Sequence, residues 1–177
     1  MIWGVTGCVG AGKSTVAAIL VGFGARVLDV DQVAATALRE SALGLTAAQA
    51  LEAVVKGGPE RARLEAVLIP EVQRRVAEWC AADSELSVLD AALLFEHGLN
   101  RFCEVTVCIR CPVEERRRRV EVRSTASARL FEAIERSQWP EEKKVSAATF
   151  AFDGLEQLET LRGRLESARS ITGPSRR

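Results

Sequence analysis

A short run near the start of the chain has the composition and spacing that bind a phosphate group. The run is GCVGAGKST, from Gly7 to Thr15, with a lysine and a serine directly after its last glycine. Glycines let a backbone approach phosphate oxygens closely, and the N–H groups at the start of a helix supply a positive field. Lys13 would then reach the terminal phosphates of a nucleotide, and the Ser14 hydroxyl would bind Mg²⁺.

The flanks of this run support the same interpretation. An apolar segment from Met1 to Val5 predicts a strand before the loop, and apolar periodicity from Thr15 to Phe23 predicts a helix after it. A glycine-rich turn that binds nothing is the alternative. We disfavour it because the motif residues and both flanks agree.

Aspartates at the expected ends of two further strands are candidates for acid–base and metal chemistry. Asp29 and Asp31 follow the second strand, and phosphoryl transfer needs a carboxylate that orients the acceptor hydroxyl and takes its proton. Because Asp31 directly precedes an expected helix, helix capping explains the spacing equally well. Asp90 ends an apolar strand, where it would either organise magnesium or simply cap the strand.

A group of arginines after residue 112 would form a lid over a bound nucleotide. Guanidinium groups neutralise the charge that develops on a transferred phosphoryl group. The alternative is a solvated helix face whose arginines pair with neighbouring glutamates. Arg119 and Arg123 are one helical turn apart and share a face, so we favour that pair for phosphate contact. The full group is Arg116, Arg117, Arg118, Arg119, Arg123, Arg129 and Arg136.

Five cysteines, an odd number, indicate reduced thiols in a protein that we expect in the cytoplasm. Cys108 and Cys111 form a C-x-x-C pair, and with Cys103 and His97 they would supply four zinc ligands. The strand expected from Cys103 to Cys108 points its two ends to opposite faces. We therefore favour buried thiols over a zinc site or a redox role.

The composition describes a globular chain without an excess of either charge. Hydrophobic residues make up 47% of 177 positions, enough for one domain with a sizeable core. Lys and Arg total 24, as do Asp and Glu, which argues against a nucleic-acid partner held by bulk charge. No apolar run is long enough to span a membrane, and the chain begins on its first strand without a leader. We expect a cytoplasmic protein that acts as a monomer.

Short apolar runs alternate with helical periodicity, which predicts a parallel sheet with helices on both faces. A strand that ends in a phosphate loop places the site at the carboxyl edge of this sheet. We expect one domain over 1–169, with helical insertions over about 32–82 and 112–140 and a disordered tail over 170–177. The expected strands are Ile2–Val5, Arg26–Asp29, Leu86–Leu89, Glu104–Ile109 and Thr149–Phe152. The expected helices are Lys13–Phe23, Gln32–Arg39, Thr46–Lys56, Glu60–Cys80 with a bend or restart at Pro70, 112–123, Ser127–Ser137 and Leu155–Arg169.

Several segments, in their order along the chain, resemble the dephospho-coenzyme A kinases, which are P-loop proteins similar to nucleoside monophosphate kinases. The segments are GVTGCVGAGKSTVA, VLDVDQVA, RLEAVLIPEV, LDAALLFEHGL, CPVEERRRRVEVR and SQWPEEK. The resemblance implies a three-layer α/β fold with a five-stranded parallel sheet, a short helical acceptor insertion and a helical lid. It also implies phosphorylation of the ribose 3′-hydroxyl of dephospho-coenzyme A by ATP and Mg²⁺, the last step of coenzyme A synthesis.

The resemblance further implies roles for individual residues. Lys13, Asp31, Arg119 and Arg123 would be catalytic, with Asp31 activating the acceptor hydroxyl. The ATP phosphates would be held by Gly10, Ala11, Gly12, Lys13, Ser14 and Thr15, with Ser14 on the metal and Arg136 in the lid. The acceptor would lie beside Asp31, Leu93, Leu94 and Glu96.

The chain departs from the pattern of this family on the acceptor side. Ile69-Pro70 stands where the family has His-Pro, and Ile69 cannot hydrogen-bond as a histidine does. The stretch from Ala34 to Glu60 is shorter, and Asp153-Gly154 lacks an asparagine expected near adenine. These departures keep two alternatives open: a P-loop kinase of another nucleotide or small metabolite, and a nucleotide-binding protein without catalysis.

Overall fold

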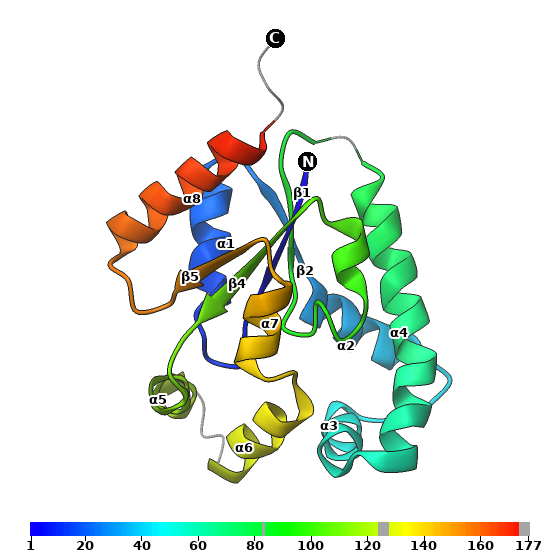
Figure 1. Ribbon diagram of the computed structural model, residues 1–177. Helices are drawn as coiled ribbons and strands as arrows, with labels where there is room; N and C mark the ends of the chain where they lie inside the picture. Colours follow the sequence, from blue (N-terminus) through cyan, green and yellow to red (C-terminus); the bar gives the residue numbers. More distant parts are fainter. Residues whose placement is uncertain (83, 124–127, 174–177) are drawn as a thin grey trace.

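The computed structural model, which describes residues 1–82, 84–123 and 128–173, contains the predicted sheet of five parallel strands (Figure 1). Their order is β2-β3-β1-β4-β5, so the first strand of the chain lies at the centre. Parallel neighbours require crossover connections, and helices supply them here. The strands are β1 (Ile2–Thr6), β2 (Arg26–Asp29), β3 (Ser87–Asp90), β4 (Val105–Arg110) and β5 (Phe150–Asp153).

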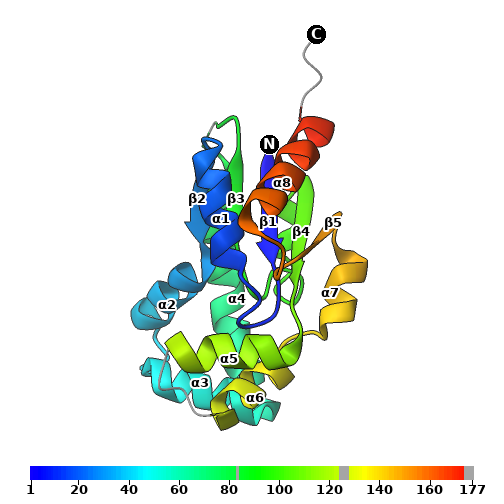
Figure 2. The ribbon, with the colours of Figure 1, turned by 90° about the vertical axis from the view of Figure 1, so that its left-hand side faces the viewer.

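Helices cover both faces of the sheet, which completes three layers. On one face α1 and α8 lie side by side, and their apolar side chains enclose Trp3 and Val107 of the central strands (Figures 1 and 2). On the other face α4 and the short 3₁₀ helix η1 pack over a second apolar cluster that includes Leu89. These elements are α1 (Lys13–Gly22), α4 (Gly58–Cys80), η1 (Leu99–Phe102) and α8 (Leu158–Thr172).

Further helices gather beyond the carboxyl ends of the strands (Figure 2). α2 and α3 follow β2 in the chain, and α5 and α6 follow β4; α7, which leads into β5, instead packs alongside β4. α3 contacts both α4 and α6, so the two groups of helices meet around the edge where the strands end. The bounds are α2 (Val30–Glu40), α3 (Ala47–Lys56), α5 (Val113–Arg123), α6 (Ala128–Ser137) and α7 (Glu141–Ala147).

The start of α2 differs from the capping interpretation in which Asp31 precedes the helix. Asp29 is the N-cap, and its carboxylate accepts a hydrogen bond of 3.0 Å from the backbone N–H of Gln32. Asp31 lies inside the first turn, so its side chain is not needed to cap the helix. Asp29 therefore caps the helix, whereas the carboxylate of Asp31 is not used for capping.

Three more elements differ from expectation. α4 continues through Pro70 without a restart, because α2 and α3 pack along it and offset the one backbone hydrogen bond that proline removes. η1 and α7 were not expected; α7 has the mostly charged sequence EEKKVSA, which carries no apolar period. α8 extends to Thr172, so residues 170–172 are helical rather than part of the predicted tail; the rest of that prediction, residues 174–177, lies outside the described chain.

Candidate active site

The glycine-rich loop between β1 and α1 adopts a backbone that requires glycine. Gly10 and Gly12 have φ angles of +81° and +108°, in the left-handed region that other residues rarely adopt. A Cβ atom at Gly10 would lie 2.6 Å from the carbonyl oxygen of Arg116, which no rotation relieves. The helix that follows has no side-chain cap and no acidic residue in its first turn, so its leading N–H groups are available to an anion.

Residues from the second half of the chain hydrogen-bond to this loop. The N–H of Val9 donates to Gln138 Oε1 at 2.9 Å, and the Cys8 thiol lies 3.7 Å from the carbonyl oxygen of Trp139. Arg116 is buried, and it donates to the carbonyl oxygens of Val9 and Cys111. The loop is thus fixed in shape before any ligand arrives.

Asp31 and Asp90 lie close to Lys13 at the carboxyl ends of the strands. Desolvation by the surrounding protein atoms raises the pKa of Asp31, although its side chain is partly open to solvent. The positive charge of Lys13 opposes that shift. Desolvation raises the pKa of Asp90 to about 6, again with Lys13 acting in the opposite direction. Asp90 Oδ1 is buried without a hydrogen-bond partner among the described residues. A lysine and two carboxylates therefore lie close enough to interact electrostatically.

A cavity of about 350 Å³ opens beside Asp31, between α2, α3, α4 and the segment after β3. Its wall is mostly aliphatic, and Ile69 and Leu93 both belong to it. Asp31 is at one side, and Arg61, Glu65 and His97 supply further polar groups. Burial lowers the pKa of His97, so the imidazole is neutral near pH 7. The lining residues are Asp31, Ala34, Ala35, Leu38, Ala47, Ala50, Leu51, Val54, Arg61, Leu64, Glu65, Leu68, Ile69, Val72, Leu93 and His97.

Two of the residues expected beside the acceptor point elsewhere. Leu94 is fully buried and packs onto Gly4, where it fills the core rather than the cavity. The carboxylate of Glu96 forms an ion pair with Lys144 at 2.6 Å and accepts a hydrogen bond from the backbone of Trp139. The segment after β3 consists of turns, in which the N–H of His97 donates to the carbonyl oxygen of Leu93, and of the three residues expected beside the acceptor only Leu93 lines the cavity.

A second cavity, of about 230 Å³, lies between the glycine-rich loop and the start of α8. Arg119 reaches into it and donates to the carbonyl oxygens of Ala11, at 3.2 Å, and Gly154, at 2.9 Å. The same guanidinium pairs with Glu115. The cavity is lined by Gly12, Thr15, Ile109, Arg119, Gly154, Glu156, Leu158 and Leu161.

The other two arginines predicted for the lid do not join Arg119. Arg136 is exposed on α6, and the structure gives its side chain no hydrogen bond or ion pair with the part of the chain that it describes. Arg123 ends α5, and its side chain lies outside the described residues. Arg116, which we expected in the lid, holds the loop instead. Gln138, which also holds the loop, had no predicted role, although it belongs to SQWPEEK, one of the segments that carry the resemblance.

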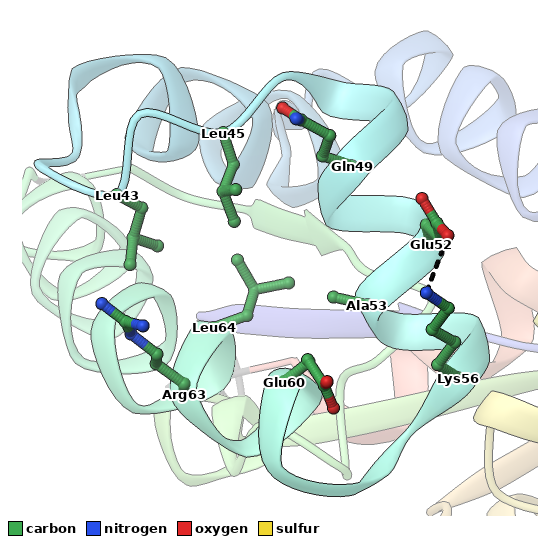
Figure 3. Close-up of a pocket in the computed structure, with 9 residues that line it drawn as sticks. All are labelled: Leu43, Leu45, Gln49, Glu52, Ala53, Lys56, Glu60, Arg63 and Leu64. Atoms are coloured by element: carbon green, nitrogen blue, oxygen red, sulfur yellow. Dashed lines mark ion pairs between the residues drawn. The ribbon is translucent and has the colours of Figure 1, made fainter.

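A third cavity, of about 270 Å³, lies between the segment 41–46, α3 and the start of α4 (Figure 3). Leu43, Leu45 and Leu64 form its apolar wall, and an ion pair of 2.9 Å between Glu52 and Lys56 stands at its rim. α3 presents one face to this cavity and the opposite face to the cavity beside Asp31. The third cavity is therefore separate from the reactive groups.

The cysteines form no metal centre. Across residues 1–82, 84–123 and 128–173, no three His, Cys, Asp or Glu side chains are grouped to hold a metal ion, and all five cysteines are free thiols. Cys108 is fully buried in β4, and burial raises the pKa of its thiol to about 12. Cys8 and Cys111 are also buried, whereas Cys80 and Cys103 are half-buried. None of the described helices is long and apolar enough to cross a membrane.

Comparison with known proteins agrees with this geometry. A family model described as dephospho-CoA kinase matches residues 1–50 and 43–159. A dephospho-CoA kinase from Thermus thermophilus is 39% identical over 181 residues, which cover 94% of this chain and 89% of that protein. The crystal structure of TT1252 from Thermus thermophilus has 38% identity and a TM-score of 0.79, with 97% of each chain covered. Dephospho-CoA kinase from Campylobacter jejuni shares the fold, with a TM-score of 0.67 at 21% identity over 97% of this chain and 96% of its own.

Proposed function

The chain belongs to the dephospho-CoA kinase family, and from that premise we propose how its residues transfer the γ-phosphoryl group of ATP to the 3′-hydroxyl of dephospho-CoA. The observation that carries the proposal is the position of Asp31. This residue lines the apolar cavity of about 350 Å³, and it lies close enough to Lys13 for the lysine charge to oppose the rise in its pKa. The donor and acceptor halves of a kinase site therefore meet at one carboxylate.

The donor half is the glycine-rich loop with the cavity beside Arg119. The N–H groups from Gly10 to Thr15 and the Lys13 ammonium would hold the phosphates. The nucleoside would then extend into the cavity lined by Gly154 and Leu158, which begins at Gly12 and Thr15. Arg119 already reaches this cavity, so its guanidinium would contact the nucleotide without a large movement.

Asp31 would act as the general base on the acceptor. Its carboxylate takes the proton of the 3′-hydroxyl, the freed oxygen forms a bond to the γ-phosphorus, and the bond from that phosphorus to the bridging oxygen of ADP breaks. The products are coenzyme A, ADP and one proton. A pKa raised toward the working pH favours a general base, and the positive charge of Lys13 opposes the rise in the pKa of Asp31.

The apolar cavity fits the rest of the acceptor. Aliphatic walls from α2, α3 and α4 would take the less polar portions of dephospho-CoA, and Leu93 would lie next to the ribose. Arg61, which also bonds the carbonyl oxygen of Ser137 at 3.2 Å, links this acceptor segment to the end of α6. We propose that α3 with α4, and α5 with α6, are the acceptor insertion and the lid.

The residues at the strand ends also fit Mg²⁺. The ion prefers oxygen ligands and keeps several waters, so it needs few protein groups. The Ser14 hydroxyl would bind it, and the buried Asp90 Oδ1, which lacks a partner among the described residues, is the kind of oxygen that a magnesium-bound water would satisfy. The ion would neutralise charge on the β- and γ-phosphates.

A direct assay tests the acceptor. The purified protein is mixed with magnesium-ATP and, in parallel, with dephospho-CoA, adenosine, AMP or shikimate, and ADP and coenzyme A are measured. We expect coenzyme A only with dephospho-CoA, and no transfer by Lys13→Ala. Transfer to another acceptor, with none to dephospho-CoA, would refute the assignment; ATP binding without any transfer would point to a protein that lacks catalysis.

A further inference from the structure

A buried arginine on α5 contacts the glycine-rich loop through both its backbone and its side chain. Arg116 is only 3% exposed, and its carbonyl oxygen lies so close to Gly10 that a Cβ atom there would approach it to 2.6 Å. Its guanidinium donates from Nη1 to the carbonyl oxygen of Val9, at 3.4 Å, and from Nε to that of Cys111, at 2.9 Å. α5 and the loop are therefore joined at two points, and one of them needs the charged side chain.

The charge of Arg116 is balanced by a glutamate on α6. Its two Nη atoms donate to the carboxylate oxygens of Glu135 at 2.5 and 2.6 Å. Well-packed apolar residues would stabilise such a junction at least as well, because a buried ion pair must first lose its water. The neighbouring Arg117 already joins α5 to α6 through Glu132, at 3.3 Å, in a more exposed position. The buried pair therefore calls for an explanation other than the attachment of two helices.

Arg116 fixes the direction of the peptide group between Val9 and Gly10. That group consists of the Val9 carbonyl, which accepts from Arg116, and the Gly10 N–H, which has no acceptor among the described residues. The peptide is trans, so its carbonyl and its N–H point in opposite directions. The hydrogen bond from Arg116 therefore turns the Gly10 N–H away from the guanidinium. The N–H of Val9, on the preceding peptide group, is held separately by Gln138.

We propose that Arg116 is a positioning residue of the donor site, which holds the Val9–Gly10 peptide group so that the Gly10 N–H faces the phosphates of the nucleotide. This inference rests on the proposed role of the glycine-rich loop in binding ATP. Without the hydrogen bond, the conformational freedom of Gly10 would let the peptide group rotate and present its carbonyl oxygen to the phosphate instead of a donor. Glu135 holds the guanidinium in place, so α6 contributes to the donor site without touching the nucleotide.

The test removes the donor to Val9 and leaves no unpaired charge behind. Arg116→Met with Glu135→Gln is compared with Arg117→Met with Glu132→Gln, which breaks the neighbouring ion pair between the same two helices. We expect the Kd for magnesium-ADP, measured by calorimetry, to rise by roughly 10-fold in the first variant, the value of one charge-assisted hydrogen bond. In the second it should change by less than about twofold, as for an exposed ion pair. The inhibition constant of adenosine, which carries no phosphate, should stay unchanged in both.

A second replacement keeps the buried charge and guards against a variant that fails to fold. Arg116→Lys retains a positive group beside Glu135, but one ammonium replaces the separate N–H groups that reach Val9, Cys111 and Glu135. We expect the same loss of affinity for magnesium-ADP, again with the inhibition constant of adenosine unchanged. Melting temperatures of all variants show that folded proteins are compared.

The outcomes separate this inference from the proposed donor site. If Lys13→Ala loses affinity for magnesium-ADP while the folded Arg116 variants keep it, Arg116 only joins the two helices. The same conclusion follows if the Arg117 variant loses as much affinity, or if inhibition by adenosine weakens in the same proportion. If Lys13→Ala binds magnesium-ADP as tightly as the wild type, the proposed donor site is wrong and the inference falls with it.

Discussion

Asp90 is a side chain that the fold holds in an unfavourable state. Desolvation raises the pKa of its carboxyl to about 6; the charge of Lys13 opposes this shift, and the Asp31 and Asp29 carboxylates each add a smaller rise. Its Oδ1 has no hydrogen-bond partner among the described residues. An ionised carboxyl in such a position destabilises the native protein, and this kind of strain is characteristic of functional sites.

This electrostatic cost gives a prediction with a definite sign. The folded-state pKa of about 6 lies above the unfolded value of 3.8, so the native state binds more protons between these pH values. Asp90→Asn should therefore increase the free energy of unfolding at pH 7.5 by about 1–3 kcal/mol, and the gain should vanish near pH 4. Urea unfolding at the two pH values measures it, and kcat should fall at the same time. A variant less stable than wild type at pH 7.5 would contradict the account.

The residues of the site differ in how far the sequence could predict them. Lys13 and Ser14 belong to a contiguous motif, so their positions follow from local spacing. Gln138 and Arg116 could not be found in this way, because they act on the loop through contacts more than a hundred residues away in the chain. Glu96 was placed wrongly for the same reason: its buried partner Lys144 lies on a helix without a recognisable apolar pattern.

The helix α5 shows that a run of arginines is not one surface. Arg116 points inward and pairs with Glu135 of α6, Arg118 points to solvent, and Arg119 reaches the loop and Gly154. A helical turn of 3.6 residues distributes four successive side chains in all directions. The interpretation of a salt-bridged helix face therefore applies to Arg117 and Arg118, whereas phosphate contact stays a prediction for Arg119.

Arg119 and Arg118 provide a matched pair for testing the donor side. Both pair with Glu115, but only Arg119 lines the cavity at the glycine-rich loop. We expect Arg119→Met to raise the KM for ATP by roughly 10-fold, equivalent to about 1.4 kcal/mol of lost binding, whereas Arg118→Met should change it less than twofold. Steady-state kinetics with varied ATP measures this. Equal effects of the two replacements would show that the guanidinium at 119 has no special part in nucleotide binding.

The strands and longer helices could be predicted within a few residues because their apolar periods are strong. Pro70 misled the prediction for α4, since tertiary packing outweighs one lost hydrogen bond. Asp29 rather than Asp31 caps α2, because the helix starts at Val30. The apolar period of the sequence indicates a start two residues later, at Gln32. Both errors are local, and neither changes the topology.

The molecule as a whole divides into a rigid sheet with its core helices and a set of helices around the reactive edge (Figures 1 and 2). The proposed donor site joins these parts, because it takes residues from α1, α5 and the segment after β5. Bound nucleotide should therefore stabilise the entire fold. The parallel sheet with helices on both faces follows from the alternation of strands and helices, whereas the separation of the three cavities depends on side-chain packing that no sequence pattern reports.

The melting temperature should show this coupling. Magnesium-ATP at about 100 times its Kd stabilises the native state by about 2.7 kcal/mol, which corresponds to a rise of roughly 5–11 °C for a chain of this size. Lys13→Ala should abolish most of the rise without lowering the melting temperature of the free protein, since Lys13 is only partly buried. Differential scanning calorimetry with and without nucleotide decides the matter; an unchanged rise in Lys13→Ala would contradict the assigned donor site.

The measurement that bears most directly on the whole account is steady-state coenzyme A formation by Asp31→Asn. The replacement keeps the shape and removes the basic oxygen at the point where donor and acceptor halves meet. We predict that kcat falls by about 10²–10⁴-fold while the KM for ATP changes by less than twofold. Wild-type turnover by purified, folded Asp31→Asn protein would contradict the central claim that this carboxylate activates the acceptor.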